Sequence, residues 1–164
     1  MTATELHVRP AVAADLPRMA ELFWATRQAA VPLMPPPVHT LAEVVVHYSS
    51  FDLESGERQA WVAEDERGLV GYAEIKADWL DDLYVAPWAQ GEGIGSTLLE
   101  IVKAHRPDGF ELWVFESNAP ARAFYARHGL VEVERTDGSG NEERAPDIRM
   151  RWQGGSRPTS HPVD

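Results

Sequence analysis

The chain has 164 residues, a formal net charge of −11 and no cysteine. Its length fits one domain with a real core, and a hydrophobic fraction of 44% with six tryptophans argues against disorder. The acidic excess speaks against nucleic-acid binding, because phosphate contacts demand a basic face. The lack of cysteine excludes disulfides, a thiolate nucleophile and cysteine-ligated metal.

The sequence shows no signal for a membrane or for export. No apolar run is long enough to span a bilayer. Residues 1–9 lack a basic stretch followed by an apolar one, so we expect no signal peptide. These observations predict a cytoplasmic protein that does not meet a membrane. The negative charge would suit a cationic acceptor such as an amine, and it would equally serve solubility.

Strand and helix patterns alternate along the chain, and no internal repeat is visible. The expected elements are a strand over 6–10, helices over 15–28 and 40–48, strands over 58–64, 69–77 and 80–86, a helix over 93–105, a strand over 110–115, a helix from 118, and a final hairpin of 130–135 with 148–152. The proline-rich segment 29–39 is expected to be a loop.

Three of these elements carry more specific signals. Thr40 and Glu43 form a capping box that opens the second helix. Asn118 is a good N-cap, and Gly129 would end its helix in the left-handed conformation. The strand 110–115 is nearly continuous in apolar residues, which predicts burial of both its faces.

A glycine-rich turn connects the strand Leu83-Tyr84-Val85 to the helix that starts near Gly93. The backbone N–H groups at a helix N-terminus lack intrahelical partners, and the helix dipole adds partial positive charge there. Such a turn binds phosphate without a basic side chain. The patterns of a P-loop (GxxxxGK[ST]) and of a dinucleotide fingerprint (GxGxxG) are both absent.

Two motifs identify the chain as a member of the GNAT superfamily of acetyl-coenzyme A-dependent N-acyltransferases. The string Gln90-Gly91-Glu92-Gly93-Ile94-Gly95 resembles the superfamily's pyrophosphate-binding turn, Q/R-x-x-G-x-G/A. The segment from Asn118 to Leu130 resembles its second signature, N-x-x-A-x-x-x-Y-x-x-x-G-[FL]. The resemblance runs from about Leu6 to Trp152 and is sharpest from Leu83 to Leu130.

The resemblance implies an α/β (α+β) architecture. We expect a mixed, mostly antiparallel sheet of about seven strands, with helices on both faces and a splayed central pair of strands. One N-acetyltransferase domain would cover 1–153, and the Gly/Ser/Pro-rich end, 154–164, would be a disordered tail.

The resemblance also implies acetyl-coenzyme A as cosubstrate. The histidines form no metal-ligand spacing, so no metal is expected. Backbone groups of Leu83 and Val85 would hold the pantetheine arm between the splayed strands, and residues 91–96 would hold the pyrophosphate. Asn118 and the helix behind it would wall the other side. The residues expected to bind the coenzyme are Leu83, Tyr84, Val85, Gln90, Gly91, Glu92, Gly93, Ile94, Gly95, Ser96, Asn118, Ala121, Phe124 and Tyr125.

Amide formation from a thioester needs a neutral amine, a stabilised oxyanion and a proton for the departing thiolate. By resemblance, Tyr125 would protonate the thiolate, and the main-chain N–H of Val85 would donate to the oxyanion. The candidates for the general base are Asp81, Asp82, Glu74 and Glu111. We favour Asp81, because its side chain should share the face of Leu83 if no bulge intervenes.

The acceptor is expected to be a small primary amine that attacks acetyl-coenzyme A directly in a ternary complex. Protein N-terminal acetyltransferases often carry a glutamate five residues before the motif asparagine, and Trp113 stands there in this chain. Four aromatic residues are expected on the acceptor side or in the core: Trp24, Tyr48, Phe51 and Trp79.

Acidic residues are expected to rim the acceptor side, next to the proline-rich loop before His39, where they would attract a cation. They are Asp81, Glu142, Glu143 and Asp147. The loop around 142 and 143 equally fits a solvated turn. A protein lysine or N-terminal acetyltransferase and a non-catalytic acyl-coenzyme A-binding domain stay open as alternatives. The oligomeric state, a homodimer included, does not follow from the sequence.

Overall fold

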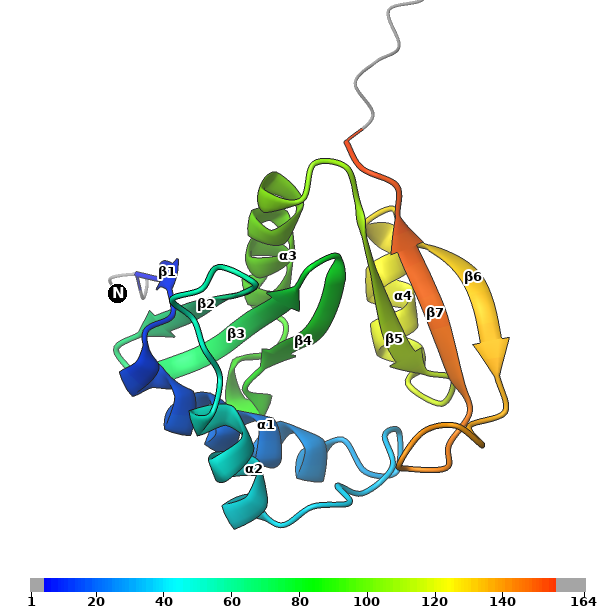
Figure 1. The fold of residues 1–164 in the computed structure, drawn as a ribbon, viewed down its shortest axis with the longest axis horizontal. Helices are drawn as coiled ribbons and strands as arrows, with labels where there is room; N and C mark the ends of the chain where they lie inside the picture. The colour runs from blue at the N-terminus through cyan, green and yellow to red at the C-terminus, as the bar shows by residue number, and fades with distance from the viewer. Residues whose placement is uncertain (1–4, 156–164) are drawn as a thin grey trace, which may run out of the picture.

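A mixed seven-stranded sheet with helices on both faces makes up the computed structural model, which describes residues 5–155 (Figure 1). The strand order is β1-β2-β3-β4-β5-β7-β6, and only the β4–β5 pair is parallel. The expected fold class is therefore confirmed. Of the expected tail, 154–164, residues from 156 onward lie outside the described part of the chain.

The elements follow the sequence pattern to within about two residues at each end. The strands are β1 (His7–Pro10), β2 (Arg58–Asp65), β3 (Gly68–Lys76), β4 (Trp79–Val85), β5 (Phe110–Phe115), β6 (Val131–Thr136) and β7 (Asp147–Trp152). The helices are α1 (Leu16–Ala29), α2 (Leu41–Ser49), α3 (Ile94–His105) and α4 (Ala119–Arg127), with short 3₁₀ turns η1 (Ala13–Asp15) and η2 (Pro87–Ala89). No helix within 5–155 is long and apolar enough to cross a membrane.

The predicted helix caps are present. The Thr40 hydroxyl accepts a hydrogen bond from the N–H of Glu43 at 3.2 Å, and the Glu43 carboxylate accepts one from the N–H of Thr40. The Asn118 side chain accepts from the N–H of Ala121 at 3.3 Å, and Gly129 ends the α4 segment with φ of +87°. Each cap satisfies backbone groups that a helix end leaves without partners.

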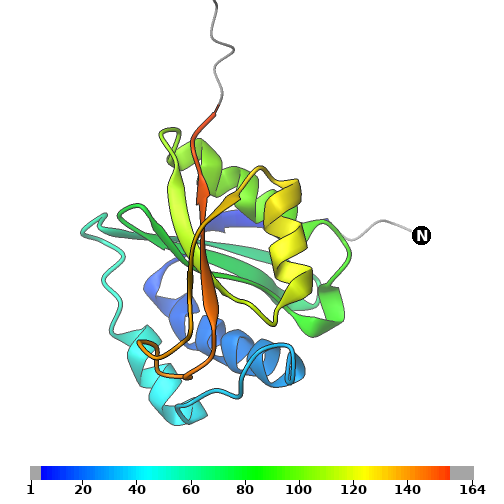
Figure 2. The same ribbon diagram turned by 90° about the vertical axis from the view of Figure 1, so that its right-hand side faces the viewer.

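Alternate residues of β3 and β4 point to opposite faces of the sheet. On one face, Tyr84 packs edge-on against Phe23 of α1, with ring centroids 5.3 Å apart. On the other face, a Cβ at Gly95 of α3 would lie 3.7 Å from the side chain of Val85. The α1–α2 layer and the α3–α4 layer thus cover opposite faces, as the two views show (Figures 1 and 2).

A β-bulge interrupts β4 at Asp81. Glu74 of β3 lies opposite Asp82, and Ile75 lies opposite Leu80, so Asp81 has no partner in this ladder. The extra residue shifts the alternation, and the expectation that Asp81 shares the face of Leu83 is therefore wrong. Asp81 instead lines a pocket on the same side as Asp82.

The strand β5 is buried on one face only, which corrects the expectation of burial on both. Phe110, Leu112 and Val114 are buried, whereas Trp113 is 45% exposed. Figure 1 gives the reason: α4 lies behind β5 and β7, and no described helix covers their front face. Trp79 of β4 lies parallel to Trp113 there, with ring centroids 6.4 Å apart.

Candidate active site

The strands β4 and β5 pair only where they begin and then diverge (Figure 1). Their recorded ladder contains one pair, Trp79 with Glu111. Directly after β4, Ala86 donates its N–H to the Val70 carbonyl of β3 at 2.8 Å. Because N–H groups alternate in direction along a strand, those of Leu83 and Val85 point to the opposite edge, where β5 no longer pairs. The end of β4 therefore offers main-chain groups to a ligand between the strands.

The glycine-rich turn presents the N-terminus of α3 beside this edge. Gly91 and Gly93 have φ of +82° and +84°, a conformation that a side chain rarely adopts, and a Cβ at either would meet nothing within 4 Å. The first helical hydrogen bond runs from Thr97 to Gly93, at 3.1 Å. The N–H groups of residues 94–96 precede it and have no intrahelical acceptor. These amides and the open turn fit a diphosphate.

Three polar side chains of the turn are tied to their surroundings. Gln90 donates from Nε2 to the Val85 carbonyl at 3.2 Å. The Glu92 carboxylate accepts two bonds from Arg67 of the β2–β3 turn, at 2.9 and 3.1 Å. The hydroxyl of Ser96 lies 3.0 Å from Nε2 of His128. The turn is thus held from β4, from the β2–β3 turn and from the end of α4.

The helix α4 forms the wall opposite β4. The ring of Phe124 lies 3.5 Å from the position of a Cβ at Gly95, so α4 packs directly on the start of α3. Tyr125 stacks edge-on against Phe124, with centroids 5.3 Å apart. Burial and the charge of Asp82 raise the pKa of the Tyr125 hydroxyl, which therefore keeps its proton at neutral pH.

A pocket of about 590 Å³ opens on the α1–α2 side of β4. Its apolar lining includes three aromatic rings, Phe23, Tyr48 and Phe51. Its charged lining has six carboxylates against two arginines: Glu43, Glu74, Asp81, Asp82, Glu142 and Glu143, with Arg27 and Arg58. Segments from 23 to 143 in the sequence meet here, and the excess of carboxylates suits a cationic guest.

Asp81 and Asp82 lie side by side where the pocket meets β4. Burial raises the pKa of Asp81, and the charge of Asp82 raises it further. Burial also raises the pKa of Asp82, whose carboxylate accepts a hydrogen bond from the Tyr48 hydroxyl at 2.8 Å. That hydroxyl also lies 2.5 Å from the hydroxyl of Tyr72. Two adjacent, half-buried carboxylates with raised pKa are typical of general acid–base sites.

The other two candidates for the general base are Glu74 and Glu111, and Arg58 contacts Asp81 at 3.6 Å as well as Glu74. Glu74 is fully buried and pairs with Arg58, whose guanidinium lies over the ring of Phe51 at 4.0 Å. Glu111 pairs with Arg149 at 2.9 Å on the open face of β5 and β7, and does not line the pocket. Asp81 lines the pocket and keeps 46% of its side chain exposed, whereas Glu74 is closed off from solvent and Glu111 lies elsewhere, so the geometry favours the aspartates of β4.

The mouth of the pocket joins two loops that are distant in sequence. His39 lies between Glu43 and Glu142, at 3.3 and 3.1 Å, and these carboxylates raise the pKa of its imidazole. Asp147, expected on this rim, is absent from the lining and bonds to Thr136 instead. Of the four aromatic residues expected on the acceptor side or in the core, two line the pocket and two do not. Tyr48 and Phe51 line the pocket, whereas Trp24 and Trp79 do not.

Comparisons with known proteins bear on this arrangement. A family model described as an acetyltransferase (GNAT) domain matches residues 56–132. The peptidyl-lysine N-acetyltransferase YiaC of Escherichia coli is 33% identical over 97 residues, 57% of this chain and 63% of that protein, so the chain spans less than two thirds of it. An uncharacterized N-acetyltransferase of Archaeoglobus fulgidus is 30% identical over 119 residues, 63% of this chain and 80% of that protein.

The chain belongs to the GNAT family of acetyltransferases. Its fold agrees with that of a solved member, the phosphinothricin acetyltransferase of Sinorhizobium meliloti in complex with acetyl-coenzyme A. The TM-score is 0.68 at 22% identity, over 92% of this chain and 89% of the other. As a member of this family, the domain is an acyltransferase.

Some residues of the GNAT pocket were missed by the sequence reasoning. Arg27 continues the buried face of α1, which also carries Leu16, Ala20 and Phe23, and is only 5% exposed. A charged residue on an apolar helix face was the signal that could have found it. Arg58 lines the pocket from a strand where the sequence pattern gives no comparable signal, and the same holds for Tyr72, which is buried behind Tyr48 and does not line the pocket. Within 5–155, no group of three or more His, Cys, Asp or Glu side chains could hold a metal ion.

Proposed function

We propose that this GNAT domain transfers the acetyl group of acetyl-coenzyme A to a compact cationic primary amine. The observation that carries the proposal is the acidic, aromatic pocket of about 590 Å³ on β4. It lies on the opposite face of β4 from the glycine-rich turn and the helix α4. The strand β4 would thus lie between an amine site on one face and a thioester site on the other.

The coenzyme would supply the acetyl group as a thioester, and the chain would hold it largely through its backbone. The N–H groups of residues 94–96 would bind the diphosphate, with Gly91 and Gly93 leaving room for it. The main-chain groups of Leu83 and Val85 would bind the pantetheine arm. An acidic protein could bind the anionic coenzyme in this way, because the backbone amides at the start of α3 need no net positive charge around them.

Three groups of this chain would carry the chemistry. Asp81 would accept a proton from the ammonium, directly or through water, because an alkylamine with a pKa near 10.4 is almost wholly protonated at neutral pH. The N–H of Val85 would donate to the carbonyl oxygen as negative charge develops on it. Tyr125 would give its proton to the departing thiolate. Attack would be direct, in a ternary complex.

A second candidate is acetylation of a peptidyl lysine. The observation that favours it is the match to YiaC, whose name gives that activity. A lysine side chain is itself a cationic amine, so the acidic lining would suit it too. The pocket argues for a compact guest, since the α2 start and the loop with Glu142 meet across its mouth through His39.

The test is a thiol-release assay with acetyl-coenzyme A, small primary amines and a lysine-containing peptide. The proposal predicts turnover with small cationic amines and little with the peptide. Faster turnover of the peptide would favour the second candidate. Coenzyme binding without turnover of any amine would favour a non-catalytic acyl-coenzyme A-binding domain.

A further inference from the structure

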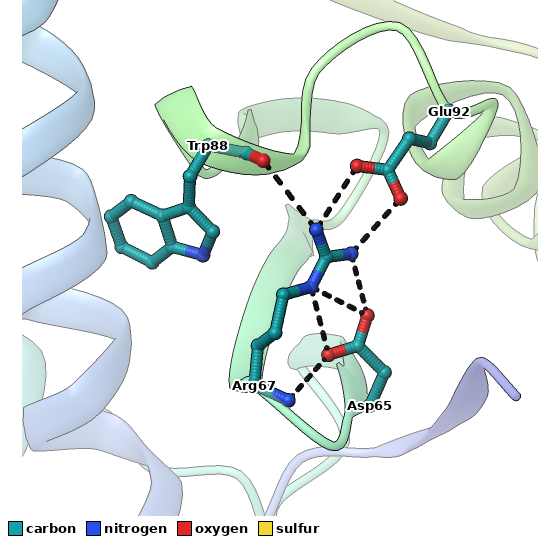
Figure 3. Close-up of polar contacts among 4 residues, drawn as sticks. All are labelled: Asp65, Arg67, Trp88 and Glu92. Atoms are coloured by element: carbon teal, nitrogen blue, oxygen red, sulfur yellow. Dashed lines mark hydrogen bonds and ion pairs between the residues drawn. The ribbon is translucent and has the colours of Figure 1, made fainter. Parts of the chain in front are cut away.

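Arg67 connects the β2–β3 turn to the glycine-rich turn (Figure 3). Its Nη1 and Nη2 donate to the two oxygens of the Glu92 carboxylate, at 3.1 and 2.9 Å. Nη1 also donates to the carbonyl of Trp88 at 3.4 Å. On its own turn, Nη2 donates to Asp65 at 2.7 Å, and Nε lies 3.2 Å from both Asp65 oxygens.

Hydrogen bonds fix the position of the Arg67 guanidinium. All three of its nitrogens have acceptors, in the fork geometry that only arginine offers. The Asp65 side chain is 2% exposed and accepts from the backbone N–H of Arg67 at 2.8 Å, so the anchor lies in the fold itself. The Glu92 side chain is 46% exposed. Because Asp65 is the buried partner and Glu92 the exposed one, Arg67 holds the glycine-rich turn to the end of β2.

The negative charge of Glu92 is unfavourable at this position. It lies between Gly91 and Gly93, in the turn whose amides would receive a diphosphate, and an unpaired carboxylate there would repel that ligand. The bidentate pair with Arg67 draws the carboxylate toward the β2–β3 turn, and the guanidinium, which Glu92 shares with Asp65, partly offsets its charge. The bond to the Trp88 carbonyl holds the start of the turn as well.

We infer that Arg67 is a positioning residue for the coenzyme. It partly offsets the charge of Glu92 and holds the glycine-rich turn in the shape that receives a diphosphate. The inference rests on the proposed function, in which that turn binds acetyl-coenzyme A. Arg67 acts through Glu92 and not by touching the acetyl group, so it affects coenzyme affinity and leaves the chemical step alone.

The test compares R67Q, E92Q and the double variant R67Q/E92Q by calorimetric titration with acetyl-coenzyme A. R67Q should raise Kd about three- to fivefold, the upper part of the range of an exposed ion pair. R67Q/E92Q should recover most of that loss, because the Glu92 carboxylate is gone and the Asp65 carboxylate is the same in both variants. The ratio of Kd between R67Q and the wild type should shrink as salt rises, because salt screens the repulsion. A loss of shape alone would give neither the recovery nor the salt effect.

The matched control is R135Q, since Arg135 pairs with Glu132 at 2.7 Å on the distant strand β6. Its Kd should equal that of the wild type. S-acetylpantetheine, which lacks the diphosphate, should be used equally well by R67Q and the wild type, with equal kcat/KM. An unchanged Kd in R67Q, or a double variant as weak as R67Q, would overturn the inference. A wild-type protein that does not bind acetyl-coenzyme A would instead overturn the proposed function.

Discussion

Tyr125 and the aspartates of β4 face the proposed chemistry from opposite sides. The pKa of the tyrosine hydroxyl is raised by burial and by the charge of Asp82, so the group stays protonated and ready to donate. The pKa values of Asp81 and Asp82 are raised as well, so a carboxylate there is a better proton acceptor than one in water. The charge of Asp82 thus raises the pKa of both the proposed acid, Tyr125, and the proposed base, Asp81.

Replacement of Tyr125 by phenylalanine tests the acid. Y125F should lower kcat by about 10²- to 10⁴-fold, the usual contribution of a positioned proton donor. Kd for acetyl-coenzyme A should change little, because the ring remains in contact with Phe124. Steady-state kinetics and a binding titration would measure the two effects. Full activity of a folded Y125F protein, with chemistry limiting the rate, would remove Tyr125 from the mechanism.

The pH profile of kcat/KM for the amine tests the aspartate pair. The negative charge of Asp82 raises the pKa of Asp81. In D82N that charge is gone, so the pKa of Asp81 falls and the acidic limb of the profile should move to lower pH. D81N serves as the comparison and should lower kcat/KM about 10²-fold or more. An acidic limb that stays in place in D82N would contradict the proposed coupling.

At the scale of elements, the glycine-rich turn and the first turn of α3 decide the coenzyme site. Gly95 has an ordinary helical conformation, and a Cβ there would make ordinary contacts with Phe124 and Val85, at 3.5 and 3.7 Å. G95A should therefore fold normally. G95D should fold too, but it places a carboxylate beside the proposed diphosphate site.

Thermal shift measurements with acetyl-coenzyme A separate these two variants. The coenzyme should raise the melting temperature of the wild type, and this shift should disappear in G95D. G95A is the control for the loss of glycine alone and should keep most of the shift. A G95D protein that binds the coenzyme with wild-type affinity would move the diphosphate away from this turn.

The elements themselves could be predicted from the sequence because their signals are local. Thr40 with Glu43 and Asn118 with Gly129 mark helix ends by hydrogen bonds that form within a few residues. The bulge at Asp81 could not be predicted, since it depends on how β4 pairs with β3. Nor could the exposure of Trp113, because an apolar strand does not reveal whether a helix covers it.

At the scale of the whole molecule, the pocket is made by parts that are far apart in the sequence. The acidic rim of Glu142 and Glu143 was predictable from the fold resemblance, whereas the two arginines of the pocket were not. Arg27 reaches the rim from α1, with Nη2 3.8 Å from Glu143, and Arg58 comes from the start of β2. Which charges meet in a pocket can be known only from the packing of distant elements.

The double variant E142Q/E143Q tests the rim. It should raise KM for a cationic amine at low ionic strength and leave kcat and KM for acetyl-coenzyme A alone, as expected when binding is lost equally in the ground and transition states. The effect should fade with added salt, because the rim side chain of Glu142 is well exposed. An unchanged KM would assign the loop to a solvated turn.

The most direct test of the central claim is kcat/KM for three acceptors of equal length: 1,4-diaminobutane, 1-aminobutane and 4-aminobutyrate. Each presents a primary amine on a four-carbon chain, and the far end is an ammonium, a methyl group or a carboxylate; kcat/KM of the diamine is divided by two for its two equivalent amines. A pocket lined by six carboxylates and two arginines predicts the highest value for the diamine and the lowest for the carboxylate. Equal values, or a preference for 4-aminobutyrate, would contradict the assignment of this pocket to a cationic amine.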